Sequence, residues 1–136
     1  MSNKQIALDY FEMATRDVAK ALASFAPDAE FITPIGRLPL PGGVEAYLEG
    51  FRQSFPDSGF DIENVVEQGD QVAVEGYWFG TNTGSILLPD GGTLPATNRH
   101  VRAPFVTFFT IQNGKLKSHR GYWDMAGFMR QLGLGG

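Results

Sequence analysis

The sequence predicts an α+β fold in which N-terminal helices pack on one face of a strongly bent, mostly antiparallel sheet. Apolar residues recur at three- and four-residue steps in the first part of the chain, as they do on helices. Four longer strand-like segments then follow in two consecutive hairpins. With 136 residues, of which 43% are hydrophobic and 19% charged, the chain fits a single domain covering residues 1–136.

Two apolar helical stripes open the chain. They consist of Ile6, Ala7, Tyr10, Phe11 and Ala14, followed by Val18, Ala21, Leu22 and Phe25. Thr15-Arg16-Asp17 can restart the second helix, because Thr and Asp side chains accept hydrogen bonds from the first amides of a helix. A short strand is expected at 29–33, and Val44, Tyr47, Leu48 and Phe51 form a third helical stripe after a loop rich in Pro and Gly.

The rest of the chain has strand patterns. Segments 60–67 and 71–81 are joined at 68–70, and segments 102–111 and 116–124 are joined through Asn113-Gly114, a strong hairpin signal. The connection 84–100 contains the turn sequence Pro89-Asp90-Gly91-Gly92 and is expected to form a ribbon extension or a mobile rim.

Charge and composition exclude several classes of function. A net charge of -4 argues against nucleic acid or an anionic membrane as partner, since both require a basic surface. With no Cys and only 2 His, a disulfide framework, a thiolate nucleophile and a Cys/His metal site are not expected. We expect no cofactor. We see no signal peptide or membrane span and therefore expect a soluble, cytoplasmic protein.

The most informative stretch is His119-Arg120-Gly121-Tyr122-Trp123-Asp124, at the end of the last predicted strand. If Asp124 is buried among the neighbouring aromatic residues, desolvation raises its pKa towards the range useful for proton transfer. Alternatively, Asp124 is the partly exposed N-cap of a helix at 125–132 that ends at Gly133. The residues alone leave both interpretations open.

Strand geometry bears on whether His119 and Asp124 can act together. They are an odd number of positions apart, which places them on opposite faces of a regular strand. Gly121 offers a bulge that would bring both to the cavity face. Without a bulge, Arg120 becomes the inward partner of Asp124.

Proton transfer next to a carbonyl needs an acid or base and hydrogen-bond donors for the developing oxyanion. Asp124 is the acid we nominate, and Glu75, in the middle of a strand, is a weaker candidate. His119 ranks first among the donors, ahead of Asn82, Tyr77 and Tyr122. Aromatic residues of the sheet, including Trp78, Phe105 and Trp123, either line a cavity or fill the core.

Several short motifs are found in a characteristic order. They are Phe55-Pro56-Asp57, Gly69-Asp70-Gln71-Val72-Ala73, Gly80-Thr81-Asn82-Thr83-Gly84, Asn113-Gly114-Lys115-Leu116, the pair His119 and Asp124, and Gln131-Leu132-Gly133. With these motifs the chain resembles the SnoaL-like polyketide cyclases, which have the cone-shaped α+β fold of nuclear transport factor two and ketosteroid isomerase. The resemblance implies a closed apolar cone that admits a polycyclic or other carbonyl compound. It also implies that Asp124 is the general acid/base of an intramolecular aldol closure, without metal or organic cofactor.

The chain departs from the family pattern at three places. Asn82 stands where relatives have His, and its amide can donate and accept hydrogen bonds but cannot titrate. Thr33-Pro34 follows the first strand, where relatives often have His or Asn, and Arg120 stands where Trp is common.

Three functional classes are considered. The first is a cyclase or isomerase that moves a proton on a small hydrophobic carbonyl substrate. The second is a water-activating enzyme such as an epoxide hydrolase, and the third is a non-catalytic small-molecule binding or dimerisation module. We further expect a homodimer or homotetramer.

Overall fold

The computed structural model describes residues 1–88 and 90–134, and in these residues it confirms the predicted α+β class. The helices are α1 (Asn3–Arg16), α2 (Val18–Ala23), α3 (Gly42–Ser54) and α4 (Met125–Leu132). The strands are β1 (Phe25–Thr33), β2 (Gly36–Arg37), β3 (Gly59–Gln68), β4 (Gln71–Thr81), β5 (Ile86–Leu87), β6 (Thr93–Leu94), β7 (His100–Gln112) and β8 (Lys115–Trp123).

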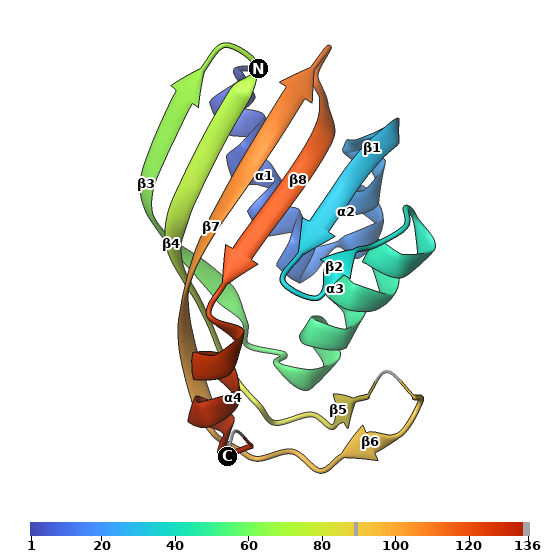
Figure 1. Ribbon diagram of the computed structural model, residues 1–136, viewed down its shortest axis with the longest axis vertical. Coiled ribbons are helices and arrows are strands. Elements are labelled where there is room, and N and C mark those ends of the chain that lie inside the picture. Colours follow the sequence, from blue (N-terminus) through green and yellow to red (C-terminus); the bar gives the residue numbers. More distant parts are fainter. Residues whose placement is uncertain (89, 135–136) are drawn as a thin grey trace.

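The main sheet is bent and has the strand order β2-β1-β8-β7-β4-β3. Its pairs are antiparallel except for β1 and β8, which run parallel. Helices α1, α2 and α3 all lie on one face of the sheet, and α4 lies beside the end at which β7 begins (Figure 1). We call the face that these three helices cover the inner face. A site can form between it and the helices.

Capping side chains explain where the first two helices begin. The Ser2 hydroxyl accepts a hydrogen bond from the Gln5 amide at 3.1 Å, and an Asp17 carboxylate oxygen accepts one from the Lys20 amide at 3.2 Å. The predicted restart of the second helix is thus confirmed. The prediction was wrong for Phe25, which is the first residue of β1 and not part of α2. Helix α2 ends at Ala23 because the Ser24 hydroxyl and amide both bond to the Ala21 carbonyl.

Both predicted hairpins form. Asn113 and Gly114 have φ angles of 53° and 75°, as the favoured two-residue turn between β7 and β8 requires. The connection after β4 contains the two-stranded ribbon β5–β6, one of the two forms expected for it. Pro89, the first residue of the predicted turn there, lies outside the described residues.

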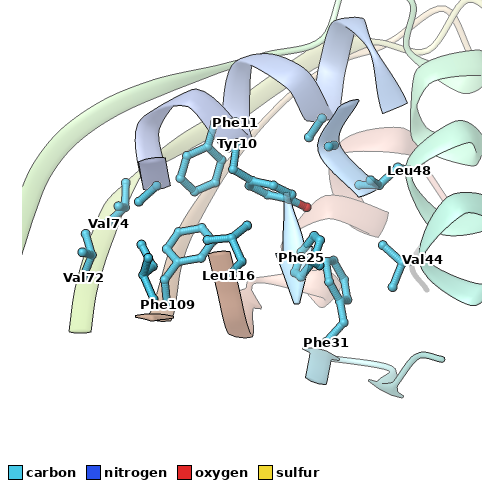
Figure 2. Packing of buried hydrophobic residues seen from close by; sticks show 14 of the residues in the cluster. Tyr10, Phe11, Phe25, Phe31, Val44, Leu48, Val72, Val74, Phe109 and Leu116 are labelled. Carbon is cyan, nitrogen blue, oxygen red and sulfur yellow. The ribbon is translucent and has the colours of Figure 1, made fainter. Parts of the chain in front are cut away.

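The main core lies between α1 and the inner face of the sheet. Figure 2 shows Tyr10 and Phe11 of α1 above Phe109 and Leu116 of the sheet, with Phe25 from β1 beside them. All five are buried. None of the helices in the described part of the chain has the length and apolarity needed to cross a bilayer.

Candidate active site

An apolar cavity of about 100 Å³ lies between α1, α3 and the inner face of the sheet. Its aromatic lining comes from both layers and includes Phe11, Phe51, Phe60, Trp78, Phe105 and Trp123. Trp78, Phe105 and Trp123 were among the aromatic residues expected at a cavity, and their roles in binding stay predictions.

His119 lines this cavity and is 7% exposed. Its imidazole stacks on Phe31 with ring centroids 4.0 Å apart and an interplanar angle of 4°. Tyr10 and Phe109 meet the same imidazole edge-on at 5.3 and 5.4 Å. The ring is therefore fixed on several sides by aromatic residues.

The His119 imidazole is neutral and incompletely hydrogen-bonded. Burial lowers its pKa to about 3, although the backbone of His119 and of Ile32 opposes part of this shift. Nδ1 of His119 is buried and has no hydrogen-bond partner among the described residues. Leaving a buried polar group without a partner costs about 1–3 kcal/mol, so this nitrogen requires an explanation.

The inward position of His119 does not depend on a bulge at Gly121. The β7–β8 register is regular at Gly121, which pairs with Thr107, and it shifts only between Thr110 and Ile111. His119, Gly121 and Trp123 consequently share the inner face. The bulge considered at Gly121 does not form, and the alternative without a bulge, in which Arg120 faces inward, is not found either.

Gly121 instead leaves room for the imidazole. A Cβ atom built on Gly121 would lie 2.9 Å from Cε1 of His119, which is closer than packed carbon atoms approach each other. The absence of a side chain at Gly121 thus lets the His119 ring occupy its position.

Asp124 lies outside the cavity, contrary to its expected position. It is exposed, it is not among the residues that line the cavity, and it is the N-cap of α4. One of its carboxylate oxygens accepts a hydrogen bond from the Gly127 amide at 2.9 Å. Strand β8 ends at Trp123, so Asp124 stands directly before α4. There its carboxylate pairs with a helix amide that would otherwise have no partner. Of the two interpretations of Asp124, the N-cap describes its position.

Asn82 is completely buried, but its side chain faces protein groups and does not line the cavity. Its Nδ2 donates to the carbonyls of Ser54 at 3.1 Å and Gly84 at 2.9 Å. Its Oδ1 accepts from the amide and the hydroxyl of Thr97 at 2.7 and 2.9 Å. All four hydrogen-bonding positions of the amide are used, which leaves none for a ligand.

Two further candidates, Tyr77 and Arg120, lie on the outer face of the sheet, opposite the helices. Tyr77 lies beneath Arg102, whose Cζ is 4.2 Å from the ring centroid, and Arg120 lies over Phe108 at 6.0 Å. Neither Tyr77 nor Arg120 is among the lining residues, so the structure does not place these two candidates for substrate binding at the cavity. Tyr122 contributes to the lining while 47% exposed.

Glu75 is exposed, and Oε1 of its carboxylate accepts a hydrogen bond from Nδ2 of Asn64 at 3.1 Å. The described lining residues include no Asp or Glu. No group of three or more His, Cys, Asp or Glu side chains in residues 1–88 and 90–134 is placed to hold a metal ion.

Two tyrosines in the cavity lining were not nominated from the sequence. Burial raises the pKa of Tyr10, and the nearby Tyr47 adds to this effect. Burial also raises the pKa of Tyr47 to about 12, although a hydrogen bond from Trp123 opposes it. Both tyrosines belong to apolar helical stripes. Their polar hydroxyl groups within these stripes were the signal in the sequence that could have identified them as cavity residues.

Tyr47 is oriented by Trp123, whose Nε1 lies 3.2 Å from its hydroxyl oxygen. The indole can only donate, so the Tyr47 oxygen accepts and its own proton points elsewhere. Tyr10, Tyr47 and His119 together supply the cavity with hydrogen-bonding groups that are neutral at pH 7.

Comparisons with solved structures agree on the fold. AclR from Streptomyces galilaeus has a TM-score of 0.83 at 20% identity, covering 97% of this chain and 85% of AclR. A candidate SnoaL-like polyketide cyclase from Jannaschia sp. CCS1 has a TM-score of 0.81 at 23% identity, covering 96% and 90% of the two chains. A protein with a ketosteroid isomerase-like fold from Catenulispora acidiphila has a TM-score of 0.77 at 16% identity, with coverages of 96% and 93%.

The comparison with curated proteins finds no match. The family model described as SnoaL-like polyketide cyclase matches residues 4–132, which includes every helix and strand from Lys4 to Leu132. The chain therefore belongs to the SnoaL-like polyketide cyclase family and has its cone-shaped fold.

Proposed function

We propose that the protein binds a small hydrophobic carbonyl compound in the aromatic cavity and transfers a proton at the carbon next to the carbonyl. The outcome would be ring closure or isomerisation. Two facts about His119 carry the proposal: the residue lines the cavity, and its buried Nδ1 has no hydrogen-bond partner among the described residues. A ligand group that reaches this nitrogen would relieve the cost of leaving it unsatisfied.

The cavity volume limits the size of the ligand. About 100 Å³ is on the order of the ~150 Å³ void that holds one benzene molecule. The enclosed part of the ligand is therefore one aromatic ring or a group of similar size. This is smaller than the polycyclic compound that the family resemblance suggested.

The two tyrosines are suited to bind the carbonyl oxygen. Trp123 already donates to the Tyr47 oxygen, which leaves the Tyr47 O–H proton available to an acceptor. Tyr10 presents a second buried hydroxyl, which points towards Leu48 of α3 in Figure 2. Hydrogen-bond donors fixed in a dry site stabilise an enolate more strongly than water does.

His119 is the proton carrier in this proposal. A neutral imidazole nitrogen takes the proton from the carbon, and the electron pair moves to the carbonyl oxygen as the enolate forms. The nearby enolate then favours the charged imidazolium, which returns the proton to carbon or to the oxygen formed by ring closure. Asp124 takes no part, because it lies outside the cavity as the N-cap of α4.

A non-catalytic binding module is the second candidate. It is favoured by the absence of any carboxylate among the described lining residues, since carboxylates are common bases in such reactions. An epoxide hydrolase finds no support, because it would need acidic residues beside a shared water.

Deuterium exchange into phenylacetone tests this function. Phenylacetone has one ring and a carbonyl, and its exchange with solvent can be followed by NMR. The wild type should accelerate exchange. His119→Phe, which keeps the aromatic stacking, should lower the rate by roughly 10²–10⁴-fold, the usual scale of acid/base catalysis, while binding is retained.

Asp124→Asn is the matched control and should exchange at the wild-type rate. Equal exchange in wild type and His119→Phe would remove His119 as the carrier. Binding without acceleration by the wild type would favour the binding module, and no binding would overturn both candidates. Both tryptophans of the chain line the cavity, so their fluorescence can report binding.

We also propose that the protein self-associates through the outer face of the sheet. Val66, Ala73, Phe108 and Arg120 are consecutive partners across strands β3, β4, β7 and β8. Val66 is 56% and Phe108 40% exposed. Exposed apolar side chains that lie close together on one face, as Val66 and Phe108 do, are typical of a protein contact surface.

A further inference from the structure

Arg52 is the only charged side chain among the described residues that line the cavity. It lies in the last turn of α3, and its side chain is 47% exposed. A side chain that both lines the cavity and contacts solvent lies where the cavity opens. Arg52 therefore places a positive charge at the entrance to an otherwise neutral and largely aromatic space.

The intrahelical ion pair of Arg52 does not occupy the whole guanidinium. Nε and Nη2 each lie 3.3 Å from the same carboxylate oxygen of Glu49, which precedes Arg52 by three residues. Pairs of this kind at a surface contribute little, about 0–1 kcal/mol. A guanidinium has five N–H donors, so donors remain for a second anion.

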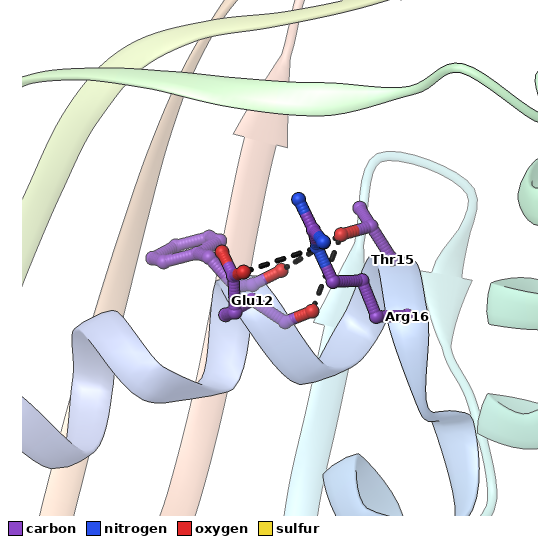
Figure 3. A network of polar contacts seen from close by, with 4 residues as sticks. Glu12, Thr15 and Arg16 are labelled. Carbon is purple, nitrogen blue, oxygen red and sulfur yellow. Dashed lines mark hydrogen bonds and ion pairs between the residues drawn. The ribbon is translucent and has the colours of Figure 1, made fainter.

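A polar group on α1 that also lines the cavity is already used within its own helix. The hydroxyl of Thr15, which also lines the cavity, lies 3.2 Å from the Glu12 carbonyl oxygen and donates to it (Figure 3). The Thr15 hydroxyl therefore has no donor left for a ligand, although the residue lines the cavity. Arg52 is the one charged hydrogen-bond donor among the described lining residues.

We infer that the ligand carries a carboxylate, which Arg52 binds at the opening while the ring occupies the aromatic cavity. The ligand class is thus a monocyclic aryl keto acid. This inference rests on the proposed function and adds the recognition of a second group. An arginine matches the two oxygens of a carboxylate in geometry as well as in charge. Partial exposure leaves the carboxylate in contact with water, which limits its desolvation cost.

Two ketones that differ by one carboxylate test the inference. Phenylpyruvate has the ring and ketone of phenylacetone with a carboxylate in place of the methyl group, and calorimetry gives the dissociation constant of each. The wild type should bind phenylpyruvate roughly tenfold more tightly, which is the scale of a partly exposed charge-assisted hydrogen bond. Arg52→Gln should remove this preference.

Arg16 provides a matched control. It lies in the last turn of α1 and pairs with a glutamate on its own helix at 3.0 Å (Figure 3), but it is not among the lining residues. Arg16→Gln removes the same charge from the protein as Arg52→Gln does. It should keep the full preference for phenylpyruvate.

Glu49→Gln supplies an effect of the opposite sign. It removes the carboxylate that pairs with the Arg52 guanidinium, so phenylpyruvate should bind more tightly than it does to the wild type. Added salt should then weaken this binding, because it screens the charges. If the wild type binds both ketones equally, or if Arg52→Gln keeps the preference, the inference is overturned while the proposed function stands. If neither ketone binds, the proposed function fails and the inference fails with it.

Discussion

At the scale of single residues, the buried imidazole of His119 makes the stability of the fold depend on pH. The unfolded chain takes up a proton on His119 below its ordinary pKa of 6.5, whereas burial lowers the pKa in the folded protein to about 3. Between these values the unfolded state binds more protons. The free energy of unfolding therefore falls with decreasing pH, by up to about 1.4 kcal/mol per pH unit.

His119→Phe should remove this dependence, because it has no titrating group. At about pH 7 it should also be more stable than the wild type, by roughly 1 kcal/mol, because no unpaired buried nitrogen remains. Denaturant unfolding between about pH 7 and about pH 5 measures both effects. The pKa of Asp57 is lowered chiefly by the hydrogen bond from the Thr81 amide. Protonation of Asp57 therefore also lowers the free energy of unfolding, but only at more acidic pH. Parallel pH profiles for the two proteins would contradict the account.

Asn82→Leu should destabilise the protein by about 2–4 kcal/mol, because it removes the hydrogen bonds that the Asn82 side chain makes to the Ser54 and Gly84 carbonyls and to Thr97. This replaces the family-based expectation of a ligand-binding amide. Thermal unfolding tests it, with the exposed neighbour Thr83→Ala as control. A stable Asn82→Leu protein with weakened ligand binding would restore the binding role.

At the scale of elements, α4 depends on the side chain that precedes it. Asp124→Ala should cost about 1 kcal/mol of stability, the usual value of an N-cap, without changing ligand binding. Asp124→Asn should match the wild type in both, because Asn is an equally good N-cap. Denaturant unfolding and tryptophan fluorescence check these results. A selective loss of ligand binding in Asp124→Asn would show that Asp124 acts on the ligand after all.

Elements set by local patterns were predictable from the sequence. The stripe containing Tyr10 and Phe11 gave α1, and Asn113-Gly114 gave the β7–β8 turn. The inward face of β8 was not predictable, because alternation separates His119 from Arg120 without saying which faces the helices. That choice is made by α1 and α3, which are distant in sequence. The position of Asp124 depends on where β8 ends, and strand ends are poorly defined by local pattern.

At the scale of the whole molecule, the two faces of the sheet differ in their partners. Helices cover the inner face (Figure 1), whereas Phe108 and Val66 are exposed on the outer one. We expect sedimentation velocity to show a dimer or tetramer, and Phe108→Lys to shift it towards the monomer, because a charge in an apolar contact is costly. A monomeric wild type at high concentration would contradict this expectation.

The most direct measurement of the central claim is the ¹⁵N NMR spectrum of the histidines at about pH 7, with and without phenylacetone. The chain has 2 histidines, and the exposed His100, which does not line the cavity, serves as internal control. His119 should be neutral in the free protein, since its pKa is lowered to about 3. On binding, its ring nitrogen signals should shift while those of His100 stay in place. A charged His119 in the free protein, or His119 signals that do not respond to a bound ketone, would contradict the account.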